Sequence, residues 1–336
     1  MSDSVFITGV AGFLGSHLAD FFLNKGFKVG GVDNLVGGYK DNVSNNIEFH
    51  ECDLLDQDNL EKHIKGYELV YHTACLPYEG LSVFSPSLIS NNTYQITINA
   101  FVASIKANVK KFVHCSSMAR YGFQKITPFT EDMVCNPIDP YGISKYGAEL
   151  VIKNLSKVHS LPVVIAIPHN IIGPRQKYDD PFRNVASIMI NLMMSGRQPV
   201  IYGDGKQTRC FSDIDDDIFC LYKFAEDDRA LGEIFNIGPD EETVTIIELA
   251  ELIAKILNFK LDPVFLDDRP QEVKHATCSA EKIRKYFDYK TSISLEDSLK
   301  KMVEYIDKRG ALDFQYHLPI EIVNKKTPIS WTKKLF

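Results

Sequence analysis

Short apolar segments alternate with longer amphipathic segments along the first half of the chain. Six apolar runs, several rich in β-branched residues, predict strands at residues 3–8, 27–33, 46–53, 67–75, 110–117 and 161–168. Between the runs, apolar residues recur at helical spacing and predict helices, the longest of them at residues 86–108 and 140–159. Strands that alternate with helices in this way predict an α/β fold, a doubly wound parallel sheet with helices on both faces.

In the second half of the chain, the predicted strands are shorter and alternate less regularly with the helices. Helical patterns occupy residues 184–196, 245–257 and 295–310, with short strands near Val200 and Phe235 and at residues 262–267. We interpret residues 1–168 as the sheet domain, interleaved with later segments, and residues 169–310 as a smaller α/β C-terminal lobe that binds the substrate. Residues 311–336 form a C-terminal extension that contains the single tryptophan, Trp331, and we expect it to dock on the body of the protein.

Composition narrows the class of protein. The chain has 336 residues, 45% of them hydrophobic and 24% charged, and a net charge of -7, with no block of Lys or Arg longer than two. This argues against binding to nucleic acid or to an anionic membrane. No apolar run approaches the roughly 18 residues of a membrane helix, and no basic segment precedes the first strand, so we expect a cytoplasmic protein.

The cysteines and histidines give no sign of disulfide bonds or of a metal site. The seven cysteines are scattered without a C-x-x-C motif, and the nine histidines do not cluster at ligand spacing. We therefore expect reduced thiols and no metal site.

A glycine-rich turn follows the first predicted strand. Gly9, Gly12 and Gly15 are spaced i, i+3, i+6 and lead into a helix, and the next strand ends at Asp33. Glycines let the backbone approach a pyrophosphate, whose charge the helix N-terminus favours, and a carboxylate at the end of the second strand accepts hydrogen bonds from a ribose. The pattern predicts a Rossmann dinucleotide site. Because Asp33 would repel a 2'-phosphate and no arginine follows it at once, we expect NAD and not NADP.

A hydroxyl, a phenol and an ammonium occur close together in the sequence HCSSMARYG and the following PYGISKYGAE. On a helix, Tyr141 and Lys145 lie on the same face, one turn apart. A cation there is expected to lower the pKa of the Tyr141 phenol and make it a base near neutral pH. Ser117 lies at the end of its strand and is expected at the same edge of the sheet as the glycine turn, Asp33, Asp53, Ala74 and Pro168.

The segments TGVAGFLGSH, Asp33, Asp53-Leu54, SSMARYG and YGISK resemble the extended short-chain dehydrogenase/reductase family, specifically its NAD-dependent nucleotide-sugar epimerases and dehydratases. The resemblance implies that Tyr141 is the catalytic base, that Lys145 binds the nicotinamide ribose, and that Ser117 hydrogen-bonds the reacting hydroxyl. It implies that NAD is bound by Gly9, Gly12, Phe13, Leu14, Gly15, Asp33, Asn34, Asp53, Leu54, Ala74, Asn92, Ser116, Tyr141, Lys145 and Pro168. For Asn92, Thr93 is an equal alternative.

The second half carries further matches to this family. HNIIGPRQ places Asn170 near the sugar and phosphates, and Asn184-Val185 aligns with a loop that lies over them. In PVIYGDGKQTRCF and DRPQEV, the resemblance gives Arg209 and Arg269 to the diphosphate and Glu272 to the nucleotide ribose. Guanidiniums pair with phosphate oxygens in bidentate fashion, which suits this assignment. Tyr202 either stacks on the base or belongs to the core.

The residues beside Ser117 bear on the reaction. Related 4,6-dehydratases carry Asp-Glu there, whereas this chain has Met118 and Ala119, which cannot transfer protons. We therefore expect 4-epimerisation of a nucleotide-diphosphate hexose, with a UDP-linked sugar as the partner molecule. The alternatives are a 4-reductase or dehydratase of the same family and, in another class, a non-catalytic dinucleotide-sensing protein.

Two further expectations follow from the resemblance. Ala276, four residues after Glu272, is expected to border the sugar, and its small side chain would admit UDP-GlcNAc/UDP-GalNAc, with or without UDP-Glc/UDP-Gal. Relatives commonly form homodimers through the helix before the Tyr-Lys motif and the helix that contains it. The apolar positions of both helices are compatible with a homodimer here.

Overall fold

The computed structural model describes residues 3–336 and contains a seven-stranded parallel sheet. The strand order is β3-β2-β1-β4-β5-β6-β11, so the chain starts in the middle of the sheet and winds outward in both directions. The strands are β1 (Ser4–Thr8), β2 (Lys28–Asp33), β3 (Glu48–Glu51), β4 (Leu69–His72), β5 (Lys111–Cys115), β6 (Val163–Pro168) and β11 (Ile234–Ile237). This confirms the doubly wound α/β fold, and it places the carboxyl ends of the strands along one edge.

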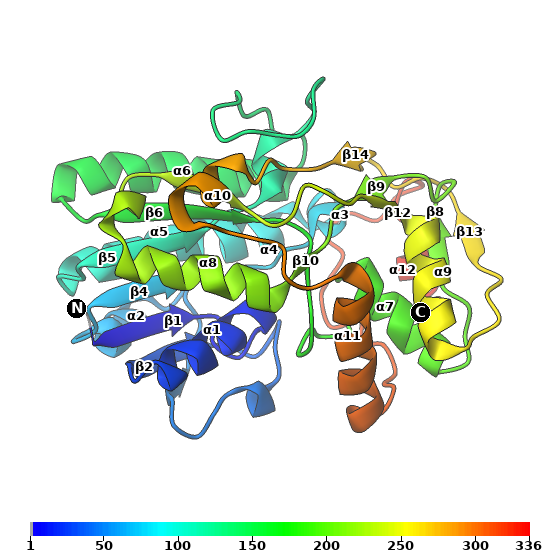
Figure 1. The fold of residues 1–336 in the computed structure, drawn as a ribbon, viewed down its shortest axis with the longest axis horizontal. Coiled ribbons are helices and arrows are strands. Elements are labelled where there is room, and N and C mark those ends of the chain that lie inside the picture. Colours follow the sequence, from blue (N-terminus) through cyan, green and yellow to red (C-terminus); the bar gives the residue numbers. More distant parts are fainter. Residues whose placement is uncertain (1–2) are drawn as a thin grey trace.

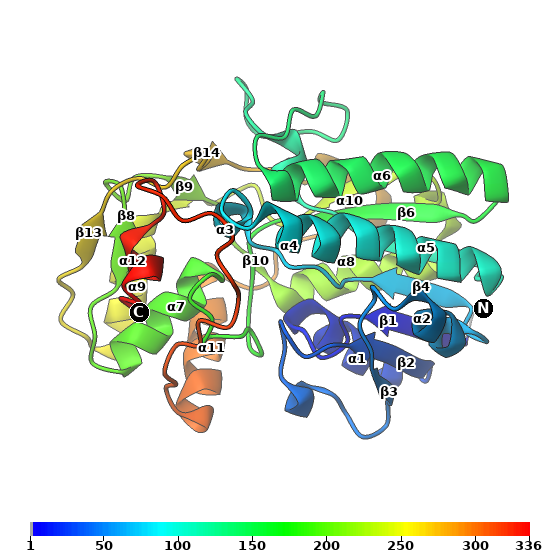
Figure 2. The same cartoon turned by 180° about the vertical axis from the view of Figure 1, so that it is seen from behind.

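Helices cover both faces of the sheet, as Figures 1 and 2 show from opposite sides. One face is covered by α1 (Phe13–Asn24), α8 (Ile214–Glu226) and α10 (Glu281–Phe287). The other is covered by α2 (Gln57–Ile64), α5 (Ile96–Lys106) and α6 (Pro140–His159). Apolar side chains from alternate positions of β1 enter the two cores, because successive side chains of a strand point to opposite faces: Val5 and Ile7 to one, Phe6 to the other.

The helix predicted at residues 86–108 is interrupted. It consists of α4 (Pro86–Ser90), a π-helical turn (Asn91–Gln95) and α5. Asn92 has φ -86° and ψ 19°, outside the helical region, and its side-chain amide donates to the Leu88 carbonyl at 3.0 Å. Such π-turns are frequent at functional sites, and a periodic apolar pattern does not reveal them.

The second lobe lies beyond the carboxyl edge of the sheet. Its helices are α7 (Val185–Met194), α9 (Ile246–Leu257) and α11 (Leu295–Arg309), whose apolar faces share one core. Short strands pair between them: β7 (Ile171–Ile172) with β10 (Ser212–Asp213), β8 (Val200–Tyr202) with β13 (Val264–Leu266), and β9 (Thr208–Arg209) with both β12 (Val244–Thr245) and β14 (His275–Ala276). The strand expected near Phe235 is β11, which joins the main sheet beside β6.

The C-terminal segment, residues 311–336, crosses from the second lobe to the sheet domain and back (Figure 2). Near its middle, the Ile322 amide donates to the Phe84 carbonyl at 2.8 Å, just after α3 (Glu79–Ser82). The segment ends in the short helix α12 (Ile329–Thr332), which buries Trp331. The structure therefore shows the expected docking of the segment on the body of the protein.

No helix within residues 3–336 combines the length and the apolar character needed to cross a bilayer. Nor do these residues contain a group of three or more His, Cys, Asp or Glu side chains placed to hold a metal ion.

Candidate active site

A deep cavity opens where the carboxyl edge of the sheet meets the second lobe and the C-terminal segment. It contains all but one of the residues that the sequence predicts for the site. These are Gly9, Gly12, Phe13, Leu14, Gly15, Asp33, Asn34, Asp53, Leu54, Ala74, Asn92, Ser116, Ser117, Tyr141, Lys145, Pro168, Asn170, Asn184, Val185, Tyr202, Arg209, Arg269 and Glu272. Residues from separate parts of the chain thus line one cavity, at the edge where doubly wound sheets bind ligands.

The exception is Ala276. Its side chain is buried in β14, in the core beneath the sheet face that carries α5 and α6, and it is absent from the cavity wall. The expectation that Ala276 borders the sugar is therefore not supported. The choice between Asn92 and Thr93 has a clearer outcome. Asn92 lines the cavity, whereas Thr93 is fully buried and is not part of the cavity wall.

The glycine turn is packed too closely for side chains. Gly9 has φ +73°, and a Cβ on it would lie 2.9 Å from the Ala74 amide nitrogen; a Cβ on Gly15 would lie 2.1 Å from the Gly9 carbonyl oxygen. The backbone is left bare toward the cavity, as a bound pyrophosphate requires. Asp33 accepts hydrogen bonds from the backbone amides of Ala11 (3.0 Å) and Leu35 (2.7 Å), which fixes its carboxylate at the cavity wall. Each oxygen retains a lone pair for a ribose hydroxyl, so these residues fit a dinucleotide.

The first prediction concerns this turn. We expect Gly15→Ala to weaken NAD binding by about tenfold to a hundredfold, because the added methyl group displaces backbone, at a typical overpacking cost of about 1–3 kcal/mol. Calorimetric titration of the cofactor-free protein with NAD measures the effect. Gly147→Ala, where the new Cβ meets only the Tyr94 ring at 3.5 Å, is the matched control. Equal NAD affinity of the two variants would contradict the prediction.

Helix α6 carries the reactive side chains on one buried face. Asp139 caps its N-terminus by accepting from the Gly142 amide at 2.9 Å, and Pro140 occupies the first turn, so the helix starts immediately before Tyr141. Ser117, two residues after β5, accepts from the Ala119 amide at 3.2 Å and lowers the pKa of Tyr141. The hydroxyl and the phenol both line the cavity.

The pKa of Tyr141 does not follow the sequence-based expectation. Burial raises it well above the usual value, and the Cys75 thiol and Glu79 carboxylate raise it further, while the hydrogen bond from Ser117 lowers it. Lys145 lies 5.9 Å from the centre of the Tyr141 ring and donates to the Cys115 carbonyl at 2.7 Å. Desolvation of the phenol therefore shifts its pKa in the direction opposite to the one expected from the Tyr-Lys spacing.

Cys75 gives a second prediction. Cys75 lines the same cavity as Tyr141 and raises the pKa of its phenol. We expect Cys75→Ala to lower this pKa, so that the acid limb of the pH–rate profile, where the base becomes protonated, moves to lower pH. The pH dependence of kcat measures this shift. Cys52→Ala, a buried thiol outside the cavity, serves as the control. An acid limb that stays in place in Cys75→Ala would contradict the assignment.

A buried polar group supports the catalytic side chains from behind. Glu149, two turns after Tyr141 on α6, accepts a hydrogen bond from Ser116 and forms an ion pair with Arg120 at 3.3 Å. Glu149 is fully buried and Arg120 is only 3% exposed. The group connects α6 to the end of β5, and so fixes Tyr141 relative to Ser117.

At the opposite end of the cavity, two arginines converge on one carboxylate. Glu272 lies 3.7 Å from a guanidinium nitrogen of Arg209 and 3.2 Å from one of Arg269. The Arg269 guanidinium also lies over the Tyr202 ring, 4.6 Å from its centre. Tyr202 therefore lines the cavity, with one ring face taken by a cation. The structure brings together the four residues assigned from the sequence to the nucleotide end.

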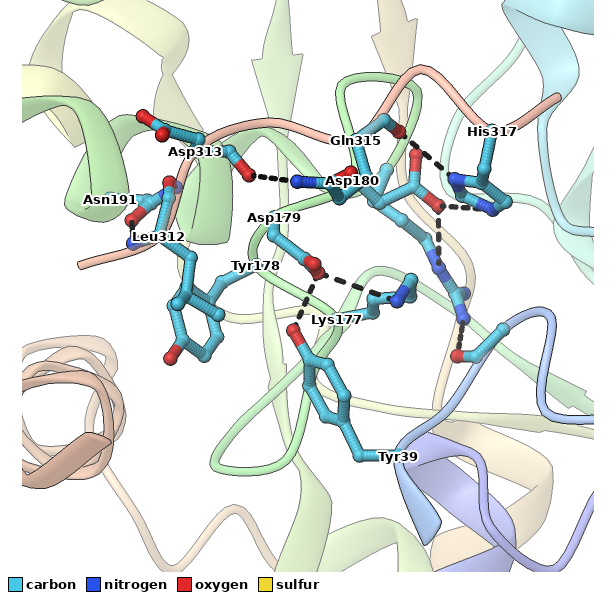
Figure 3. Close-up of polar contacts among 12 residues, drawn as sticks. Tyr39, Lys177, Tyr178, Asp179, Asp180, Asn191, Leu312, Asp313, Gln315 and His317 are labelled. Atoms are coloured by element: carbon cyan, nitrogen blue, oxygen red, sulfur yellow. Dashed lines mark hydrogen bonds and ion pairs between the residues drawn. The ribbon is translucent and has the colours of Figure 1, made fainter. Parts of the chain in front are cut away.

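The C-terminal segment completes the cavity wall. Its first part lies along α7 and residues 177–180. Figure 3 shows Leu312 hydrogen-bonded to Asn191 of α7, and His317 next to Asp180. Further on, Ser330 hydrogen-bonds the Tyr202 hydroxyl, and Trp331 packs edge-on against Phe182 with ring centres 5.2 Å apart. Trp331 and Phe336 both line the cavity.

Trp331 offers a third prediction, because it is the only tryptophan of the chain and lines the cavity. We expect UDP to change its fluorescence emission in a saturable manner, since a ligand at the nucleotide end alters the surroundings of the ring. The signal should disappear in Trp331→Phe while calorimetry still detects UDP binding. Binding by calorimetry without any change in emission would contradict the placement of Trp331.

The side chains that sequence reasoning missed in the cavity wall include Cys75, Glu79, Arg183 and Trp331. Arg183 donates to the Gly37 carbonyl at 2.7 Å and lies 4.0 Å from Asp180. None of the four belongs to a recognisable motif. A carboxylate in the otherwise apolar HTACLPYEGL segment was the only available signal for Glu79.

A family model described as the NAD dependent epimerase/dehydratase family matches residues 5–238. The chain belongs to this family. Its members depend on NAD, and the solved structures of similar epimerases include NAD complexes, so NAD is the cofactor for which the glycine turn and Asp33 are suited. The turn, Asp33 and the Ser117-Tyr141-Lys145 group all lie within the matched region.

Three relatives illustrate the range of the family. A putative UDP-glucose 4-epimerase of Methanocaldococcus jannaschii is 32% identical over 310 residues, which cover 90% of this chain and 98% of the relative. The structure of a UDP-N-acetylglucosamine 4-epimerase from Methanobrevibacter ruminantium, in complex with UDP-N-acetylmuramic acid, is 31% identical with a TM-score of 0.85, and covers 92% of this chain and 100% of its own. The structure of a UDP-glucuronic acid 4-epimerase from Bacillus cereus, in complex with UDP-glucuronic acid and NAD, is 29% identical with a TM-score of 0.84. The match covers 91% of this chain and 100% of the relative.

Proposed function

We propose that this protein is an NAD-dependent UDP-sugar 4-epimerase. The observation that carries the proposal is that Ser117, Tyr141 and Lys145 line one cavity whose other end carries Arg209 and Arg269. A sugar diphosphate bound by the arginines extends its hexose toward the phenol. The three relatives, each a 4-epimerase by name and each acting on a different UDP-sugar, support the reaction and leave the sugar open.

In the proposed reaction, the residues of the chain handle a proton while the nucleotide stays anchored. Bound NAD supplies the hydride acceptor and donor for C4 of the sugar. Tyr141 takes the proton of the C4 hydroxyl, Ser117 holds that oxygen, and the resulting 4-keto sugar turns about its diphosphate linkage before the proton returns. Anchoring by Arg209 and Arg269 permits this rotation, because bidentate guanidinium contacts fix the diphosphate and not the hexose.

Glu79 favours a second candidate, a dehydratase of the same family. Met118 and Ala119 lack acid–base groups, but Glu79 places a carboxyl group in the same cavity, and burial raises its pKa to about 7. A group that titrates near neutrality is suited to proton transfer, as the elimination of water from a 4-keto sugar requires.

One experiment separates these reactions. Purified protein is incubated with UDP-glucose, UDP-galactose and their N-acetylated counterparts, without added cofactor, and the products are identified by NMR. Interconversion of C4 epimers with retained NAD supports the epimerase. Accumulation of a 4-keto-6-deoxy sugar supports the dehydratase. In a parallel incubation with added NADH, stoichiometric consumption of the NADH indicates a reductase. A protein that binds NAD and converts none of these sugars would overturn the proposed activity.

Homodimerisation is part of the proposal. Ile143, Leu150 and Val158 of α6 are apolar and more than half exposed, at 54%, 51% and 67%. Burying such side chains against a second copy would stabilise a dimer by removing apolar surface from water. Light scattering of the purified protein measures its mass, and a monomer at micromolar concentration would contradict this part.

A further inference from the structure

Glu79 is a carboxylate without a protein partner inside the cavity. It is the first residue of α3, in the loop region after β4, and it lines the cavity as an exposed residue. Within residues 3–336, no group donates a hydrogen bond to this carboxylate and no cation forms an ion pair with it. An ionisable group held in this way faces whatever ligand fills the cavity.

The position of Glu79 along the cavity follows from its electrostatic neighbours. On one side it interacts with Tyr141, whose pKa it raises, and on the other with Arg209 and Arg269. Under the proposed function, the phenol meets C4 of the hexose, and the arginines hold the diphosphate attached to C1. The hexose connects these two points, so Glu79 lies beside the hexose and not beside the base or the NAD.

The charges nearby leave little room for an additional anion. Asp139, the cap of α6, is buried and raises the pKa of Glu79, whereas Arg209 and Arg269 lower it but are already shared with Glu272. Arg183 also lines the cavity, but its guanidinium faces Asp180 at 4.0 Å. A second carboxylate next to the ionised Glu79 would therefore meet repulsion.

We propose that Glu79 binds hydroxyl groups of the hexose and selects uncharged UDP-hexoses against UDP-hexuronates. The inference rests on the proposed function and adds a substrate class to it. It separates this protein from the relative that is named a UDP-glucuronic acid 4-epimerase. A carboxylate accepts hydrogen bonds from sugar hydroxyls, and like charges at close range strongly disfavour binding.

The test compares kcat/KM for UDP-galactose and UDP-galacturonate in three proteins. At pH 9, where Glu79 with its pKa of about 7 is ionised, we expect the wild type to prefer UDP-galactose by about a hundredfold, the order expected for two like charges a few ångströms apart at a protein surface. Glu79→Gln, which keeps the shape and removes the charge, should reduce this preference at least about tenfold, mainly by improving the uronate. Glu251→Gln removes the same charge from the exposed face of α9, outside the cavity, and should leave the preference unchanged.

Binding provides a second measurement that does not depend on turnover. Competition of the two sugars for the protein, followed by Trp331 emission or calorimetry, should show the same order in the wild type and a smaller gap in Glu79→Gln. Equal use or equal binding of both sugars by the wild type would overturn the role of Glu79, whether or not the variant folds. A preference that Glu79→Gln leaves intact would also overturn it. If neither sugar is converted but binding shows the expected preference, the proposed reaction fails while the role of Glu79 stands.

Discussion

Replacing Tyr141 by phenylalanine should lower kcat about a thousandfold, within the range of roughly 10²–10⁴ that positioned acid–base groups contribute. The substitution removes one oxygen from a side chain that is only 4% exposed and packs among Leu76, Tyr78 and Ile188, so the fold should tolerate it. The affinity for the UDP-sugar should change by only a few-fold, since the arginines at the far end of the cavity remain. Initial rates and calorimetric binding measure the two effects separately.

Tyr146→Phe is the matched control for this prediction. Tyr146 lies on the same helix, one residue after Lys145, but outside the cavity wall, with its ring near the Arg120 guanidinium. The control should retain nearly full activity. A Tyr141→Phe enzyme that kept more than a tenth of the wild-type kcat would mean that another group of the cavity, such as Cys75 or Glu79, takes the proton.

The fold was predictable where the pattern is local. Six of the seven sheet strands, β1 to β6, coincide with the apolar runs of the sequence, and motif residues lie at or just after their carboxyl ends. The sheet membership of β11 was not predictable, because four residues around Phe235 do not indicate which strand they join, and their partner β6 lies about seventy residues earlier. The π-helical turn at Asn91–Gln95 was hidden for a similar reason: it changes the hydrogen bonding and not the apolar pattern.

The site residues that belong to sequence motifs were predictable. The glycine turn, the Tyr-Lys pair and both arginines lie in recognisable segments and meet in one cavity. Glu79 and Trp331 reach the same cavity from a short loop helix and from the C-terminal segment, and only the tertiary structure brings them together. The pKa of Tyr141 illustrates the same limit, because helical spacing shows the lysine one turn away but not the burial that outweighs it.

The largest expected effect on stability comes from the ion pair behind the site. Glu149→Ala should lower the free energy of unfolding by about 3–5 kcal/mol, the usual result of removing one member of a buried ion pair. The Arg120 guanidinium, 3% exposed and 3.3 Å from Glu149, would be left without this carboxylate, and Ser116 would lose its acceptor. Urea unfolding measures the change, with Glu251→Ala on the exposed face of α9 as the control, expected within about 0.5 kcal/mol of the wild type.

A double variant without either charge tests whether the effect arises from the pair itself. In Glu149→Ala, the Arg120 charge is left without a partner. If this uncompensated charge causes most of the loss in the free energy of unfolding, the double variant Arg120→Met/Glu149→Leu should lose less of that free energy than Glu149→Ala, since both charges are then removed together. Catalysis should respond differently from stability. Because Glu149 fixes Ser116, the neighbour of Ser117, the double variant should still lose kcat even where its stability recovers. Equal recovery of stability and kcat would show that Glu149 stabilises the fold without positioning the catalytic serine.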